Sequence, residues 1–404
     1  MSKQNKRDKD ESLLEVFLST SDGIDSDIEK AKEILKEEGL DPELLRMEGI
    51  AFIKSLQKRN ETEKKTSIDF ELSELIKRLT DTGIPKSLLE KKMIPSALKN
   101  WQRLGYSSSV NAFASFVSNI FSWKESDLLG AGKLEMAALP ASLAKFKMPN
   151  NANLNQIRAY SHYAYYLSKL VAKNYGQSKV QEIPSDIDEF RDNYLKKYRV
   201  FDLQGLLNYS WEIGICVLPL NDPGVFHGAA WNIDGVRVVV IKQNTKFHAR
   251  WIFDLLHEVY HALAHLDNPN STIVETQEIN PFNDTELDEE KEANTFSHQV
   301  LFADRSEDVL NQCVQRTGGK MERLKTVVQN VARAENIRED ILANFVAFRL
   351  SLDNQNWWGA ASALQITNPD PFTLASEVLK KNISTKEMNE MEFNLLQMAI
   401  STTD

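Results

Sequence analysis

Cysteine is nearly absent from this chain, which has only Cys216 and Cys313 among its 404 residues. Two cysteines without a Cys-x-x-Cys pair exclude a disulfide framework. Their scarcity is typical of a cytoplasmic protein, and we expect that location. We expect Cys216, which stands between Ile215 and Val217, to be a small buried hydrophobic residue rather than a reactive thiol.

Long apolar runs are also lacking. No run approaches eighteen residues, so we expect no segment that spans a membrane. The first residues, MSKQNKRDKDES, have no apolar stretch and are not expected to be a secretory signal.

Positive charge is in deficit as well. The net charge of −10 argues against a chain whose whole surface binds nucleic acid, although a local basic patch is compatible with it.

One stretch, Trp251 to Leu266, carries most of the chemical information and reads WIFDLLHEVYHALAHL. It is apolar nearly all round, which predicts a buried helix. Within it, His257, Glu258 and His261 match the H-E-x-x-H zinc motif. Residues four apart share one face of a helix, so the two imidazoles can bind one metal ion and Glu258 can act as a general base. The alternative is a buried cluster of hydrogen-bonded polar residues without a metal.

A metal site needs a third ligand. His265 lies about 12 Å beyond His257 along the helix axis, too far for both to bind one ion. Further on, apolar residues at helical spacing predict a second packed helix: Ala293, Phe296, Val300 and Leu301. Glu290 and Asn294 lie four apart on it, which suits a carboxylate ligand and an amide that orients another ligand. Asp254 is a second candidate for the orienting role.

These residues resemble a family, the ImmA/IrrE-type zinc peptidases, which are soluble, gluzincin-like bacterial proteins. The family's H-E-x-x-H is followed by E-x-[EQ]-A-N-x-F, and this chain has that second pattern at Glu290 to Phe296. The resemblance covers the chain from about Asn151 onward and the first 150 residues only loosely. Tyr260 and Ala303 stand where the family often has Gly and Pro, and neither position is a ligand.

The resemblance implies a catalytic zinc centre. His257, His261 and Glu290 would bind Zn²⁺. Glu258 would be the general base, and Asn294 would orient a ligand. Such peptidases typically cleave or inactivate a DNA-binding repressor or antitoxin, often in stress or mobile-element control. We therefore expect a zinc-dependent metallo-endopeptidase that acts on a regulatory protein; a metal site kept without catalysis is the alternative. Candidate oxyanion donors, each expected to be structural or on the surface instead, are His227, His298 and Tyr260.

The chain is expected to be α+β and predominantly helical, in three parts. Residues 1–150 would form a helical N-terminal region, 151–305 a zincin-like metallopeptidase core with a small mixed β-sheet, and 306–404 a helical C-terminal region. From residue 151 onward, we expect helices at 153–176, 187–198, 203–211, 306–316, 321–334, 340–352, 371–381 and 386–400. No internal repeat or low-complexity segment stands out.

Three segments have the period-two, β-branched pattern of strands: Ile213–Pro219, Gly228–Ile233 and Val236–Lys242. The last two are joined by a tight hairpin turn at Asp234-Gly235. They lead into the motif helix, which we expect to pack on one face of the sheet. Small residues at the start of the second strand would admit a peptide backbone, and an edge strand here would bind substrate by strand addition. The polar connection from Asp267 to Asp284 should rim the cleft.

The region from Ser67 to Gly130 reads as short helices and is a candidate for a degenerate helix-turn-helix module. It carries a cluster of basic residues: Lys77, Arg78, Lys86, Lys91, Lys92, Lys99 and Arg103. Basic runs are usually solvated faces, and a helical interaction domain is the simpler interpretation. The second function that the sequence allows is a DNA-binding transcriptional regulator or antitoxin-like protein that uses a non-catalytic peptidase fold for binding.

Overall fold

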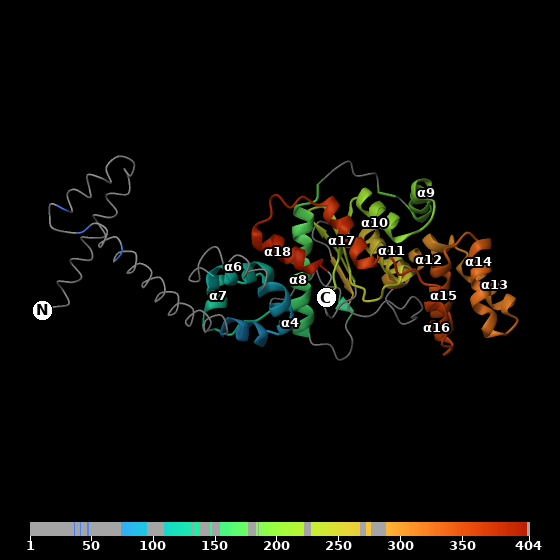
Figure 1. Ribbon diagram of the computed structural model, residues 1–404, viewed down its shortest axis with the longest axis horizontal. Coiled ribbons are helices and arrows are strands. Elements are labelled where there is room, and N and C mark those ends of the chain that lie inside the picture. The colour runs from blue at the N-terminus through green and yellow to red at the C-terminus, as the bar shows by residue number, and fades with distance from the viewer. Residues whose placement is uncertain are drawn as a thin grey trace. The chain divides into compact units, whose positions relative to one another are not determined.

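The protein is described from a computed structural model, in which the chain divides into two compact units, Met1–Phe70 and Glu71–Asp404. The described residues are 36, 41, 47, 74–94, 109–130, 132–136, 146–147, 154–176, 183–184, 186–221, 228–266, 272–275 and 288–401. The second unit is mostly helical with one small mixed sheet, which confirms the coarse fold class (Figure 1). The finer division at residues 150 and 305 stays a prediction.

The sheet has five strands in the order β1-β5-β3-β4-β2. They are β1 (Phe146–Lys147), β2 (Ile215–Pro219), β3 (Gly228–Ile233), β4 (Val236–Ile241) and β5 (Thr272–Glu275). Strand β3 is antiparallel to both β4 and β5, whereas β2 is parallel to β4 and β1 is parallel to β5. The three predicted strands are therefore present.

Two expectations about the sheet need correction. Gly228 pairs with Ile241 on one side and with Glu275 on the other, so the strand with the small residues is interior and offers no free edge. The connection after α11 (His248–Ala264) is not wholly irregular, because Thr272–Glu275 within it forms β5. Four residues inside a polar stretch are too few for a period-two pattern to be recognised.

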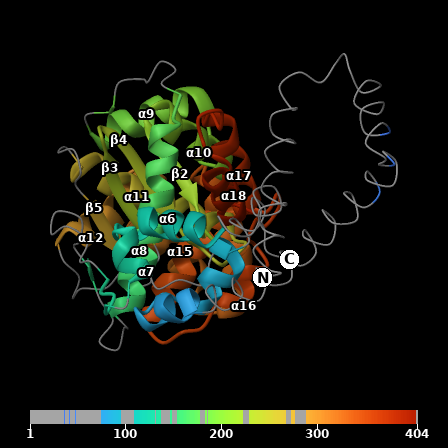
Figure 2. The same ribbon diagram turned by 90° about the vertical axis from the view of Figure 1, so that its left-hand side faces the viewer.

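Helices cover both faces of the sheet (Figure 2). Side chains alternate between the faces of a strand, so neighbours along β3 identify the layers. The Trp231 ring contacts Tyr165 of α8 (Leu154–Lys173), with ring centroids 5.9 Å apart. The next side chain, Asn232, donates from Nδ2 to the carbonyl of Leu266 at 2.6 Å, just beyond α11 (His248–Ala264) on the opposite face.

The hairpin between β3 and β4 has the turn that its sequence predicts. Asp234 and Gly235 have φ values of 52° and 88°, the left-handed pair that a tight two-residue hairpin requires. The Gly235 amide also donates to Asn232 Oδ1 at 2.9 Å. Because the Asn232 amide binds the end of α11, this side chain joins the hairpin to the helix that carries the histidine motif.

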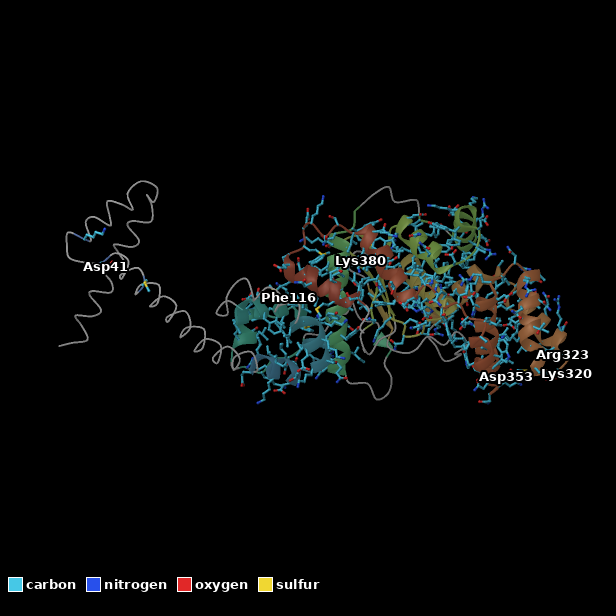
Figure 3. All side chains as sticks on the ribbon, viewed as in Figure 1. Asp41, Phe116, Lys320, Arg323, Asp353 and Lys380 are labelled. Carbon is cyan, nitrogen blue, oxygen red and sulfur yellow. The ribbon has the colours of Figure 1, made fainter. Side chains whose placement is uncertain are left out.

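Where the sequence predicts bounds from residue 151 onward, the other helices begin and end within a few residues of them, whereas the short helix Trp358–Ser362 lies where no helix is expected. They are α4 (Lys86–Leu88), η2 (Leu89–Met93), α6 (Ser109–Phe121), α7 (Glu125–Leu129), α9 (Ile187–Tyr198), α10 (Leu203–Glu212), α12 (Asp288–Phe302), α13 (Ser306–Thr317), η5 (Met321–Arg323), α14 (Leu324–Ala334), α15 (Glu339–Leu352), α16 (Trp358–Ser362), α17 (Pro371–Asn382) and α18 (Glu390–Ala399). Helix α18 begins after the expected residue 386 because Asn389 and Glu392 form a capping box. Charged side chains such as Lys320, Arg323 and Asp353 are exposed on the C-terminal helices (Figure 3).

None of the helices in the described part of the chain combines the length and apolar character that a membrane crossing needs.

His298 on α12 is half-buried among aromatic rings rather than in a polar site. Its ring contacts those of Phe253 and Phe345, with centroids 5.3 Å and 5.2 Å away. Burial, followed by the nearby positive charge of Arg349, lowers the pKa of His298 from 6.5 to about 4. Between these values the unfolded chain binds a proton that the folded chain does not, so stability falls as the pH falls through this window.

We predict that His298→Gln makes the protein less sensitive to acid. Glutamine binds no proton in either state, so the variant lacks the loss of up to about 3 kcal/mol that this shift implies between pH 6.5 and pH 4. Urea unfolding of both proteins at pH 7, 5.5 and 4.5, with a chelator present, measures the difference. Parallel stability curves for wild type and variant over this range would contradict the assignment.

Candidate metal centre

Helix α11 places the two motif histidines in the interior. Fourteen of its 17 residues are buried, which confirms the expectation of a buried helix. His257 and His261 have no solvent exposure, and their Nε2 atoms lie 3.1 Å apart. The one-turn spacing therefore brings both imidazoles to one point inside the protein.

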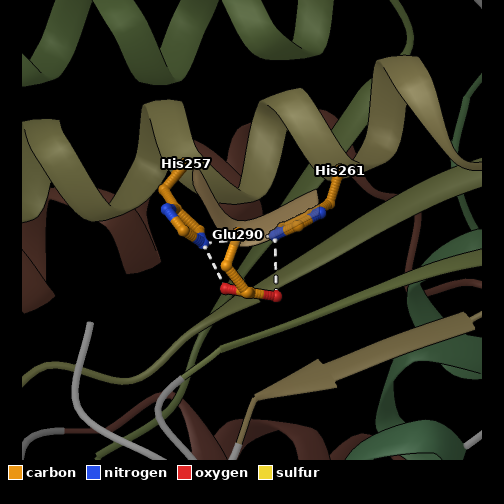
Figure 4. A group of neighbouring side chains, drawn as sticks. All are labelled: His257, His261 and Glu290. Carbon is orange, nitrogen blue, oxygen red and sulfur yellow. Dashed lines mark hydrogen bonds and ion pairs between the residues drawn. The ribbon is translucent and has the colours of Figure 1, made fainter. Parts of the chain in front are cut away.

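Glu290 reaches the same point from the first turn of α12 (Figure 4). Its Oε2 lies 3.3 Å from the His257 Nε2 and its Oε1 lies 3.7 Å from the His261 Nε2. The two helices pack against each other, and the Ser297 hydroxyl donates to the Phe253 carbonyl across their interface at 3.4 Å. The third ligand predicted from sequence spacing is thus beside the two histidines.

The three ligand atoms fit one metal ion. A tetrahedral ion with bonds of 2.0–2.1 Å separates its ligand atoms by about 3.3–3.4 Å. The two Nε2 atoms are 3.1 Å apart, and their distances of 3.3 and 3.7 Å to the two oxygens of the Glu290 carboxylate also lie around this value. The donor set points the same way, because two imidazole nitrogens and a carboxylate oxygen are all lone-pair donors that a cation brings together. His257, His261 and Glu290 can therefore hold a metal ion.

Asn294, one turn after Glu290, forms a hydrogen bond with one of the two motif histidines. The His257 Nδ1 lies 3.0 Å from the Asn294 Oδ1. An amide oxygen only accepts, so Nδ1 carries the proton and donates it, which leaves the lone pair on Nε2 directed toward Glu290. This is the orienting contact expected from the sequence.

Asp254 instead anchors the first half of α11. It forms a buried ion pair with Arg250, whose Nε lies 3.1 Å from Asp254 Oδ1, and it accepts from the Gln243 amide at 2.6 Å. The Arg250 guanidinium also lies 5.0 Å from the centre of the Phe348 ring on α15. These contacts hold the helix against the C-terminal helices, one turn before the first histidine.

Glu258 is 1% exposed and faces strand β3. A Cβ atom on Gly228 would lie 1.7 Å from the Glu258 Oε1 and 2.4 Å from its Cδ. Only glycine leaves room for the carboxylate at this position. The sequence indicated close approach to Gly228 by a peptide substrate, but the group that approaches it is this side chain of the same protein.

The remaining candidate residues lie elsewhere. His265 follows the end of α11 with its ring 5.6 Å from that of His261, and it is not part of the three-residue cluster. The Tyr260 hydroxyl donates to Glu292 Oε2 at 2.7 Å. Burial and this contact raise the Tyr260 pKa, so the phenol stays protonated. Cys216 is fully buried in β2, as expected, and burial raises its pKa. His227 lies outside the described residues.

The comparisons with known proteins give no family for this chain: no family model, no curated protein and no solved structure matches it.

We predict that Gly228→Ala destabilises the protein by about 1–3 kcal/mol, the usual cost of forcing extra atoms into a packed interior. The new methyl group would overlap the Glu258 carboxylate, so either the side chain or the strand must move. The measurement is the free energy of unfolding in urea. Gly359→Ala is the matched control, because a Cβ there meets nothing within 4 Å. Equal stability of the two variants would show that the contact between Gly228 and Glu258 is not tight.

Proposed function

We propose that this protein is a zinc-dependent metallo-endopeptidase. The proposal rests on the convergence of His257, His261 and Glu290, with the buried Glu258 one residue along the same helix. Two imidazoles and a carboxylate suit zinc, and three protein ligands leave a fourth tetrahedral position open. Open sites of this kind are typical of catalytic rather than structural zinc.

The chemistry proposed is hydrolysis of a peptide bond. Bound zinc supplies a Lewis acid that polarises a carbonyl and lowers the pKa of water toward about 7. Glu258 moves the proton: a carboxylate oxygen accepts it from the water whose oxygen bonds to the carbonyl carbon. It then gives the proton to the amide nitrogen as the C–N bond breaks. Asn294 keeps the His257 ring in the tautomer that presents Nε2.

The biological part of the proposal rests on the resemblance of the motif residues to the ImmA/IrrE-type peptidases. It makes the substrate a regulatory protein in the cytoplasm, either a DNA-binding repressor or an antitoxin. The contacts of the site support hydrolysis of a peptide bond in general. The identity of the substrate is carried by the resemblance alone.

We do not propose DNA binding, because much of the described basic cluster takes part in the fold. Lys92 is buried and donates to the Met398 carbonyl at 2.7 Å. Arg78 donates to two backbone carbonyls, those of Asp127 and Gly132, at 3.1 Å and 2.9 Å. Lys86 lies 3.4 Å from the Glu90 carboxylate. Contacts of this kind account for these basic residues without a nucleic acid. The helix-turn-helix alternative stays a prediction.

The metal assignment predicts about one zinc ion per chain, measured by elemental analysis of purified protein. His257→Ala and Glu290→Ala should lose most of it, because each removes one of three protein ligands. Glu258→Gln and Glu289→Ala are the controls and should keep it. Full zinc retention in Glu290→Ala together with loss in Glu289→Ala would move the third ligand to the neighbouring residue.

The catalytic assignment predicts that Glu258→Gln lowers the rate of cleavage by about 10²–10⁴-fold, since the amide cannot accept a proton. The two proteins are co-expressed with a repressor encoded beside their gene, and the repressor is followed by gel electrophoresis and mass spectrometry. Cleavage by wild type alone is expected. Equal cleavage by both removes Glu258 from the chemistry. Relief of repression by both without cleavage would mean that the protein acts by binding.

A further inference from the structure

A polar cavity lies at the opposite end of α12 from Glu290. It has a volume of about 80 Å³ and is bounded by α9, the C-terminal end of α12 and the turn between α14 and α15. Four arginines line it, against one carboxylate: Arg191, Arg199, Arg305, Arg338 and Glu335. In a chain with a net charge of −10, this is a local excess of positive charge.

Two of the four arginines have carboxylate partners. The Arg305 Nη1 lies 2.5 Å from Glu335 Oε2, and the Arg338 Nη2 lies 2.6 Å from Asp340 Oδ2. A second bond, from Arg338 Nε to Asp340 at 2.9 Å, makes that pair bidentate. The charges of Arg305 and Arg338 are thus balanced within the protein.

Arg191 and Arg199 have no ion pair with a carboxylate among the residues that the structure describes. Arg191 donates to the Val300 carbonyl near the end of α12, and its guanidinium lies 5.4 Å from the centre of the Phe201 ring. Asp188 and Asp192, both exposed on α9, offset its charge only from a distance. Two positive charges at the cavity are therefore not balanced by a direct partner.

A purely structural role explains only part of this arrangement. Arg191 stabilises the negative end of the α12 dipole through the Val300 carbonyl. That role does not require further arginines beside it. Burial lowers the pKa of Arg191, and the positive charge of Arg305 lowers it as well. Arg199 has a φ of 63°, a conformation that is unfavourable for a residue with a side chain.

We propose that this cavity binds a phosphate group. Guanidinium groups match the tetrahedral oxygens of phosphate through paired hydrogen bonds, and a bound anion would balance the charges of Arg191 and Arg199. The cavity is much smaller than the roughly 300–1,000 Å³ of pockets that hold drug-sized ligands. The ligand is therefore free inorganic phosphate or the phosphate of a small monoester. The proposal is independent of the peptidase activity.

The test is calorimetric titration of the full chain with inorganic phosphate at fixed ionic strength. The neutral chelator 1,10-phenanthroline is present, so that a metal ion cannot bind the phosphate. Wild type is expected to bind one phosphate with a saturable heat. Arg199→Gln should weaken binding about tenfold or more because it removes charged hydrogen-bond donors, and Arg191→Gln should do the same. Arg199 is exposed, so its variant is expected to fold normally.

Arg333→Gln is the matched control, because Arg333 is exposed on α14 and pairs with Glu339 outside the cavity. Its affinity for phosphate should equal that of wild type. Titration with phosphoserine separates the two sources: tighter binding than phosphate favours a monoester, and weaker binding favours the free ion. No saturable heat in wild type, or equal affinity in wild type and Arg199→Gln, would overturn the proposal.

Discussion

The structure depends on the meeting of two buried imidazoles and a carboxylate at the contact between α11 and α12. His257 and His261 are fully buried, and Glu290 is nearly so. Burying such groups costs several kcal/mol unless they are satisfied, and a shared cation satisfies all three at once. Two contacts across the interface keep these helices in register: the Asn294–His257 hydrogen bond and the Ser297–Phe253 hydrogen bond.

The sheet matters to the site mainly through one position. Strand β3 is interior, so it is held on both sides, and Gly228 at its first residue receives the Glu258 carboxylate. The hairpin that follows is joined to the end of α11 through Asn232. Helix α11 and strand β3 are thus in contact at both ends of the strand, through Gly228 at its start and Asn232 near its end. Backbone packing against Gly228 therefore restricts where the Glu258 carboxylate can lie.

The sequence predicts the features that depend on local spacing. The pair His257 and His261, the amide of Asn294 and the hairpin turn all follow from periods that a single element imposes. Features that depend on contacts between distant segments are either not predicted from the sequence or predicted wrongly. Gly228 was assigned to a substrate because nothing in its neighbours shows that Glu258 lies against it. The arginine cavity brings α9 beside the end of α12, where Arg191 and Val300 are 109 residues apart along the chain, and no local pattern relates them.

X-ray absorption at the zinc edge tests the central claim most directly, because it reports the ligands of the metal itself. Two imidazole nitrogens at about 2.0–2.1 Å, with oxygen ligands completing the shell, are the result that His257, His261 and Glu290 predict. The only cysteines, Cys216 and Cys313, are buried away from this cluster. A sulfur at about 2.3 Å, or a shell without imidazole, would show that the metal binds elsewhere and would contradict the account.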